Sequence, residues 1–214
     1  MKKIFSILVV FFLSAFILNA QSFEGTVDFK STTAAGDTGS FKYFGKGSKI
    51  KMQMMSTEMG SVIFDGDKTI ILLPSQKSYM EFSSDMLKQF GGMDQSEEAQ
   101  DDYSLPTKTN ETKTILGYEC TKWTYKDGNN ETELWITDKL GSYIIPSNPL
   151  MPAQGWENMF DGKPFFPLMI VSKEGGVETD RMEVTKIDKK NINDSEFLPP
   201  SDYKKMDLGN MMGQ

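Results

Sequence analysis

The sequence of 214 residues contains no histidine and a single cysteine, Cys120. The absence of histidine excludes a serine–histidine–aspartate triad, a cysteine–histidine pair and any histidine-ligated zinc or haem. One cysteine excludes an internal disulfide, and without a histidine to activate it we expect Cys120 to be a small buried apolar residue. Acidic residues are common, but no spacing singles out a catalytic carboxylate pair. We therefore predict a protein without enzymatic activity, metal or cofactor.

Long apolar runs are also scarce, and the longest lies at the N-terminus. Residues 4–18 are almost wholly apolar, follow two lysines and precede Asn19-Ala20-Gln21. This run is too short for a membrane-spanning helix, which needs roughly 20 residues. The pattern is that of a secretory signal peptide over residues 1–20, cleaved after Ala20. We therefore predict a periplasmic or secreted protein with no stable membrane insertion after cleavage.

Basic residues are fewer than acidic ones, with 23 Lys and Arg against 30 Asp and Glu and a formal net charge of −7. Removal of residues 1–20 would take away two lysines and no acid, so the mature charge would be 21 minus 30, or −9. Net charge does not attract such a protein to nucleic acid or to an anionic lipid surface. We expect no nucleic-acid partner.

Most of the remaining chain has the pattern of β-strands, in which apolar and polar residues alternate or β-branched and aromatic residues cluster. Clusters of Gly, Asp, Asn and Pro separate the runs, and the Asp-Gly turn at 65–68 is a hairpin signal. About ten antiparallel strands in one domain predict a mainly β fold, either a barrel or a strongly curved sheet. We place this single domain at residues 21–208 and expect a frayed tail at 209–214. The expected strands are 23–30, 40–45, 48–55, 60–64, 69–73, 77–82, 108–115, 118–125, 131–137, 142–145, 166–173 and 177–189.

Two segments interrupt the strand pattern. Residues 84–90, with Ser83 or Ser84 as a cap, predict a short helix that is apolar on one side. Residues 146–168 hold five of the nine prolines, which cannot donate backbone hydrogen bonds, and predict a long connection. Residues 94–102 hold five acids without the spacing of a calcium loop and predict a solvated loop. Residues 193–197 predict a short turn or helix.

A hairpin motif resembles a family of secreted bacterial proteins, domain of unknown function 4412: residues 115–123 (ILGYECTKW) match its GYxCxK hairpin and precede LWIT at 134–137. The closing stretch, with Val184 to Ile187, FLPP at 197–200 and YKKM at 203–206, is also similar to that family. The resemblance implies a fold like the LolA and LolB periplasmic lipoprotein carriers. That fold is an unclosed antiparallel half-barrel with one or two short lid helices over an apolar cavity for acyl chains. The activity of the family is itself unknown, so the resemblance implies no site residue.

The two interrupting segments could cover an open concave sheet. A loose cover leaves a ligand cavity and a tight cover leaves a filled core, and the sequence allows both. Methionine is an adaptable apolar lining, and alternation puts Met52 and Met54 on one strand face. We predict a binding protein for a lipid or acylated molecule. The alternative is an interaction module of the cell envelope that docks a partner protein over a filled core. The expected ligand-binding residues are Met52, Met54, Met86, Leu87, Phe90, Trp156 and Phe160.

Overall fold

The computed structural model describes residues 23–55, 60–66, 68–83, 86, 106–143 and 164–206. The signal-peptide pattern, the acidic stretch 94–102, most of the two interrupting segments and the tail lie outside these residues. The first strands are β1 (Gly25–Thr33), β2 (Thr38–Lys46), β3 (Lys49–Met54), β4 (Ser61–Asp65), β5 (Lys68–Leu73) and β6 (Ser78–Ser83), with the 3₁₀ turn η1 (Pro74–Gln76) before β6. The later elements are β7 (Thr107–Ile115), β8 (Tyr118–Asp127), β9 (Asn130–Thr137), β10 (Phe166–Glu174), β11 (Val177–Lys189), the 3₁₀ turn η2 (Asp194–Phe197) and β12 (Lys204–Lys205).

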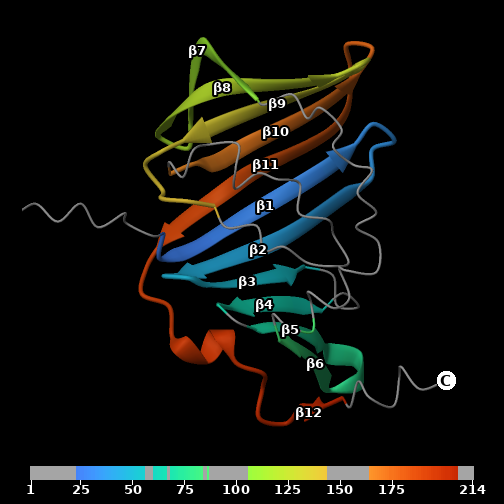
Figure 1. Ribbon diagram of the computed structural model, residues 1–214, viewed down its shortest axis with the longest axis vertical. Helices are drawn as coiled ribbons and strands as arrows, with labels where there is room; N and C mark the ends of the chain where they lie inside the picture. Colours follow the sequence, from blue (N-terminus) through green and yellow to red (C-terminus); the bar gives the residue numbers. More distant parts are fainter. Residues whose placement is uncertain are drawn as a thin grey trace, which may run out of the picture.

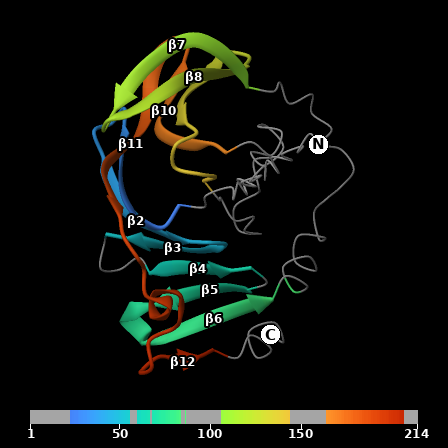
Figure 2. The same cartoon turned by 90° about the vertical axis from the view of Figure 1, so that its left-hand side faces the viewer.

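These strands form one sheet in the order β12-β6-β5-β4-β3-β2-β1-β11-β10-β9-β8-β7 (Figure 1). All neighbours are antiparallel except β12, which runs parallel to β6. The edge strands β12 and β7 lie at opposite ends of this order, and the sheet curves between them into an open half-barrel (Figure 2). The predicted mainly β, antiparallel and unclosed fold is confirmed, and a closed barrel is excluded.

One pairing joins the two ends of the chain. β1 pairs with β11, with Val27 opposite Ile187, and so connects the β1–β6 meander to the β7–β11 meander. Within each meander, tight turns set the register. Gly66 at φ 57° links β4 to β5, as the Asp-Gly signal predicts, and Leu116 and Gly117, at φ 50° and 83°, form the tip between β7 and β8.

Two details differ from the sequence prediction. The strand expected at 142–145 is not formed at residues 142 and 143, because the chain leaves the sheet there and the Tyr143 N–H donates to the Phe165 carbonyl at 2.7 Å. The Pro-rich connection ends before Phe166, so Pro167 lies inside β10. The register shifts between Pro167 and Met169, a bulge that accommodates the missing proline donor. The turn predicted at 193–197 is confirmed as η2.

Buried apolar side chains lie on both faces of the sheet. The larger cluster includes Val27, Phe29, Tyr43, Leu134 and Phe166, and its Phe29 and Tyr43 rings lie on the concave face with Tyr143. The segment leading to Tyr143, yellow in Figure 2, lies inside the curve and contacts this cluster. On the convex face, η2 and the chain before it cover a second cluster of Ile63, Ile70, Leu72, Ile192 and Phe197. No helix in the described ranges is long and apolar enough to cross a membrane.

Candidate ligand-binding face

An apolar strip crosses the concave face from β2 to β6. Its members are direct cross-strand partners and therefore share one face: Tyr43, Met52, Val62, Ile71 and Met80. Tyr43 is buried, whereas the other four are half-buried. We call these five residues the concave strip. It is a continuous run of partly accessible apolar side chains on five neighbouring strands.

A second set of apolar side chains flanks the concave strip. Ile50, Phe64 and Phe82 lie in one cross-strand row with Gly45 and Thr69. Phe64 and Phe82 are half-buried. On the other side of the strip, Met54 lies opposite Phe41 and is 39% exposed. The apolar surface is therefore about three rows wide along the strands.

Packed aromatic rings close the β2 end of the strip. The Tyr43 ring lies 5.2 Å from Tyr143 and 6.0 Å from Phe166, centroid to centroid. Phe29 stacks on Phe41 at 4.7 Å. Burial raises the pKa of Tyr143 well above its ordinary value, with a smaller contribution from Tyr43, so its hydroxyl stays protonated. This part of the concave side is filled core.

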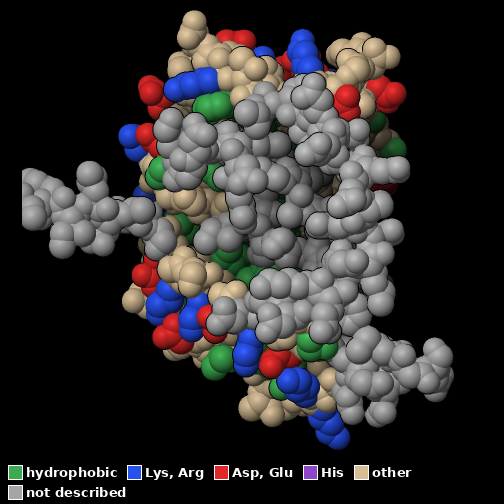
Figure 3. Space-filling view, viewed as in Figure 1, with side chains coloured by type: hydrophobic (Ala, Val, Ile, Leu, Met, Phe, Trp, Pro, Cys, Tyr) green, Lys and Arg blue, Asp and Glu red, His purple; other side chains and the backbone are tan. Residues whose placement is uncertain are grey.

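Charged residues of β2–β6 all alternate onto the opposite face. They are Lys42, Lys46, Lys49, Lys51, Asp65, Lys68 and Glu81. Each lies one or three positions along its strand from a member of the concave strip. Because side chains alternate between the two faces of a strand, each of these charged side chains points to the convex side. Figure 3 views the molecule from the concave side, with hydrophobic side chains visible near the middle and charged ones around the rim. The concave face of these five strands therefore carries no charged side chain.

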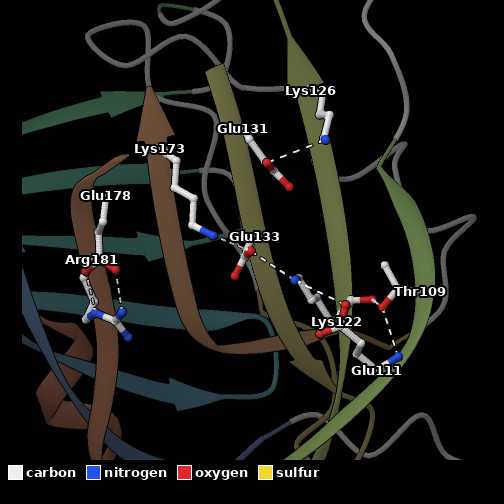
Figure 4. Close-up of polar contacts among 9 residues, drawn as sticks. All are labelled: Thr109, Glu111, Lys122, Lys126, Glu131, Glu133, Lys173, Glu178 and Arg181. Atoms are coloured by element: carbon white, nitrogen blue, oxygen red, sulfur yellow. Dashed lines mark hydrogen bonds and ion pairs between the residues drawn. The ribbon is translucent and has the colours of Figure 1, made fainter. Parts of the chain in front are cut away.

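An ion-pair network covers the outer face of the other half of the sheet (Figure 4). The Glu133 carboxylate lies 3.0 Å from Lys122 Nζ and 2.6 Å from Lys173 Nζ. Burial acts to raise the pKa of Glu133, but the hydrogen bonds from Lys173 and Lys122 outweigh it and lower that pKa. Arg181, the single arginine of the chain, is held by two hydrogen bonds to Glu178. These charges therefore pair with one another on this face.

Cys120 is fully buried and free of any disulfide, as predicted from the sequence. Burial raises the pKa of its thiol from 9.0 to about 11. Because the thiol is held protonated, we expect the folded protein at about pH 8 to resist a thiol-specific disulfide reagent and the protein unfolded in urea to react at once. The raised pKa also implies that stability falls as the pH rises from about 9 towards 11, because only the unfolded thiol ionises in that window. Rapid labelling of the folded protein would contradict this account.

The structure places some of the predicted site residues together on the concave face. Met52 lies in the concave strip and Met54 lies beside it. Met86 is half-buried just after β6, and its N–H donates to Ser83 Oγ at 3.2 Å. Leu87, Phe90, Trp156 and Phe160 lie outside the described residues. Binding at any of these positions remains a prediction.

Most residues of the concave strip were not predicted from the sequence. Val62, Ile71 and Met80 fall in strands that the pattern predicted correctly, but alternation alone does not say which side of a strand faces inward. The signal was present in the positions of the charges, because Lys49, Lys51, Asp65, Lys68 and Glu81 mark the outer side of their strands. Among the described residues, no three acidic or cysteine side chains come together as a metal site.

Together, the fold and this face define an open antiparallel half-barrel whose concave face is uncharged and apolar over β2–β6. The chain belongs to the family described as "Domain of unknown function (DUF4412)", whose model matches residues 23–203. The predicted family membership is thus confirmed. A search of curated proteins gives no match.

Several solved structures are similar in fold. An uncharacterized conserved protein from Thermus thermophilus is 9% identical over 86% of this chain and 90% of that chain, with a TM-score of 0.48. A LolA superfamily protein from Nitrosomonas europaea is 12% identical over 84% and 91%, with a TM-score of 0.34. PNGF-II is 13% identical over 86% of this chain and 31% of that chain, with a TM-score of 0.47. The chain therefore spans about a third of the PNGF-II chain.

Proposed function

We propose that the protein is a non-catalytic periplasmic or secreted binding protein that holds a hydrophobic ligand, a lipid or an acylated molecule, on the concave face of β2–β6. The segregation of charge carries this proposal. Every charged residue of these strands points to the convex side, while Met52, Val62, Ile71 and Met80 are half-buried on the concave side. A continuous apolar surface of this kind is costly to leave in water and is typical of a binding site.

The methionines in and beside the concave strip support a flexible ligand. Met52, Met54 and Met80 have unbranched side chains with three rotatable bonds, so they can repack around acyl chains of different shape. The signal-peptide pattern at residues 1–20 supports a place outside the cytosol. The absence of histidine supports a role in binding instead of catalysis.

Neighbouring methionines offer a matched test of this face. Met54 is the last residue of β3 and lies on the concave side, and Met55, the next residue, lies outside the strand and is 58% exposed. We expect wild-type protein purified from its own cell envelope to carry a lipid-sized adduct in native mass spectrometry. Met54→Glu should lower the adduct-bearing fraction about tenfold, because a carboxylate against an acyl chain loses its hydration. Met55→Glu should leave it unchanged.

The competing function, an envelope interaction module with a filled core, gives a different result in the same experiment. It requires a wild-type chain without any small-molecule adduct and with unchanged stability after delipidation. That outcome would overturn the carrier proposal. Equal adduct loss in both variants would show that a ligand binds elsewhere on the chain.

A further inference from the structure

We propose, building on the function above, that the ligand is a single-chain fatty carboxylate, with its acyl chain along the concave strip and its carboxylate at Lys204. The strip does not end at β6. Lys204 and Lys205 of β12 lie opposite Ser78 and Tyr79, and the Met206 N–H donates to the Tyr79 carbonyl at 2.8 Å. Continuing this register places half-buried Met206 beside Met80. Among the described residues, the strip is therefore closed by aromatic rings at Tyr43 and open at the β12 edge of the sheet.

Lys204 stands out at this open end. In β2–β6 and the chain from 190 to 206, all other lysines have an ion-pair partner: Lys42, Lys46, Lys49, Lys51, Lys68, Lys77, Lys190 and Lys205. Within the described part of the chain, exposed Lys204 has none. Its register opposite Ser78 puts it on the concave side, whereas Lys205 pairs with Glu81 on the convex side at 3.0 Å. One uncompensated cation thus lies at the open end of an uncharged apolar face.

Ser78 gives a second, independent sign of a missing partner. It is 8% exposed, lies between Leu73 and Lys204 in the register, and shares the strand face of Met80. Its buried hydroxyl has no hydrogen-bond partner among the described residues. Buried hydroxyls are normally paired. A ligand oxygen at the Lys204 end would supply an acceptor for this group.

The number of donors favours a carboxylate over a phosphate. One ammonium and one hydroxyl suit a monoanion with two oxygens, whereas phosphate recognition commonly uses the planar fork of arginine. The single arginine, Arg181, is already bound to Glu178. The head group is therefore expected to be a carboxylate.

The length of the strip also limits the length of the acyl chain that it can hold. From Met52 on β3 to Met206 beside β6 there are four strand spacings of about 4.8 Å, or roughly 19 Å. An all-trans hydrocarbon advances about 1.25 Å per bond, from its bond length and angle. The partly accessible length of the strip therefore corresponds to about 16 carbons.

Adjacent lysines allow a matched test with purified, delipidated full-length protein. Displacement of the neutral probe N-phenyl-1-naphthylamine would be measured with hexadecanoate, hexadecan-1-ol and hexadecyl phosphate. We expect hexadecanoate to bind about fivefold more tightly than the alcohol, a difference that Lys204→Gln removes and Lys205→Gln preserves. For saturated carboxylates, affinity should rise about fourfold per added methylene and level off near 16 carbons.

The outcomes separate this inference from the proposed function. Equal binding of alcohol and carboxylate, or an equal loss in both lysine variants, would overturn the Lys204 assignment while the alcohol still demonstrates an acyl site. Tighter binding of hexadecyl phosphate would overturn the carboxylate assignment. Failure of all three compounds to displace the probe would overturn the proposed function itself.

Discussion

Replacing Gly25 by alanine is expected to lower the free energy of unfolding by about 3 kcal/mol or more, because a Cβ atom has no room there. Gly25 has φ 148°, a region almost restricted to glycine. An added Cβ would overlap the backbone carbonyl of Asp188 on β11 and lie 3.0 Å from Lys189 Cα and Phe23 Cζ. Two of these three neighbours are backbone atoms, which cannot rotate away. The substitution would push β1 from β11 at the pairing that joins the two meanders.

A second glycine provides the control for Gly25. Gly128, in the turn between β8 and β9, also has positive φ, 56°, but an added Cβ would meet nothing within 4 Å. Gly128→Ala should therefore lower the free energy of unfolding by about 1 kcal/mol, the cost of holding an alanine in the left-handed backbone conformation. Urea unfolding of both variants measures the difference. Equal losses would mean that backbone conformation, and not contact with β11, makes Gly25 necessary.

Phe197→Ala is expected to destabilise the protein by about 3–5 kcal/mol, the usual cost of removing a buried aromatic ring. Phe197 is fully buried in η2 and packs with Ile63, Ile70 and Ile192 on the convex face. It is thus the main apolar anchor of the chain that runs from β11 to β12. Leu198, the next residue, is 56% exposed, and Leu198→Ala should change stability by less than about 0.5 kcal/mol.

Ion pairs around η2 would not replace the lost ring. Lys51 Nζ lies 2.9 Å from Glu196, and Lys46 Nζ lies 3.3 Å from Asp194. Pairs with a solvent-exposed partner contribute roughly 0–1 kcal/mol each. Urea unfolding, together with limited proteolysis of residues 190–206, would therefore show earlier cleavage in Phe197→Ala. An unfolding midpoint equal to that of Leu198→Ala would contradict the anchor role.

Local patterns predicted much of the fold because the rules that make strands are local. Alternation and turn residues located almost every strand, and the Asp-Gly signal located the β4–β5 turn. The strand predicted at 142–145 is not formed at residues 142 and 143, because Tyr143 leaves the sheet there and packs inside its curve. Pro167 lies within β10 because a bulge absorbs its missing donor, and that depends on the partner strand.

The candidate site could be predicted only in part. Met52 was predicted because methionine is an adaptable apolar residue and alternation puts Met52 on one strand face with Met54, whereas Val62 and Ile71 are ordinary strand residues in the sequence. Their relation to Met52 depends on the pairing of β3, β4 and β5, which sets them side by side. In the sequence, Lys204 is one of 23 basic residues and nothing distinguishes it from the others. Only the pairing of β12 with β6 places it at the end of the strip.

By itself, the sequence determined that the chain is a strand-rich member of its family, that histidine chemistry is absent, and which residues of β2–β6 share a strand face. Those properties follow from the amino-acid composition and from the alternation of apolar and polar residues along each strand. Only the tertiary structure decided which face is concave, that β1 meets β11, and that Lys204 lies at the open end of an uncharged strip. Each of these depends on contacts between residues far apart in sequence, such as Val27 with Ile187, and on the curvature that the packed sheet acquires.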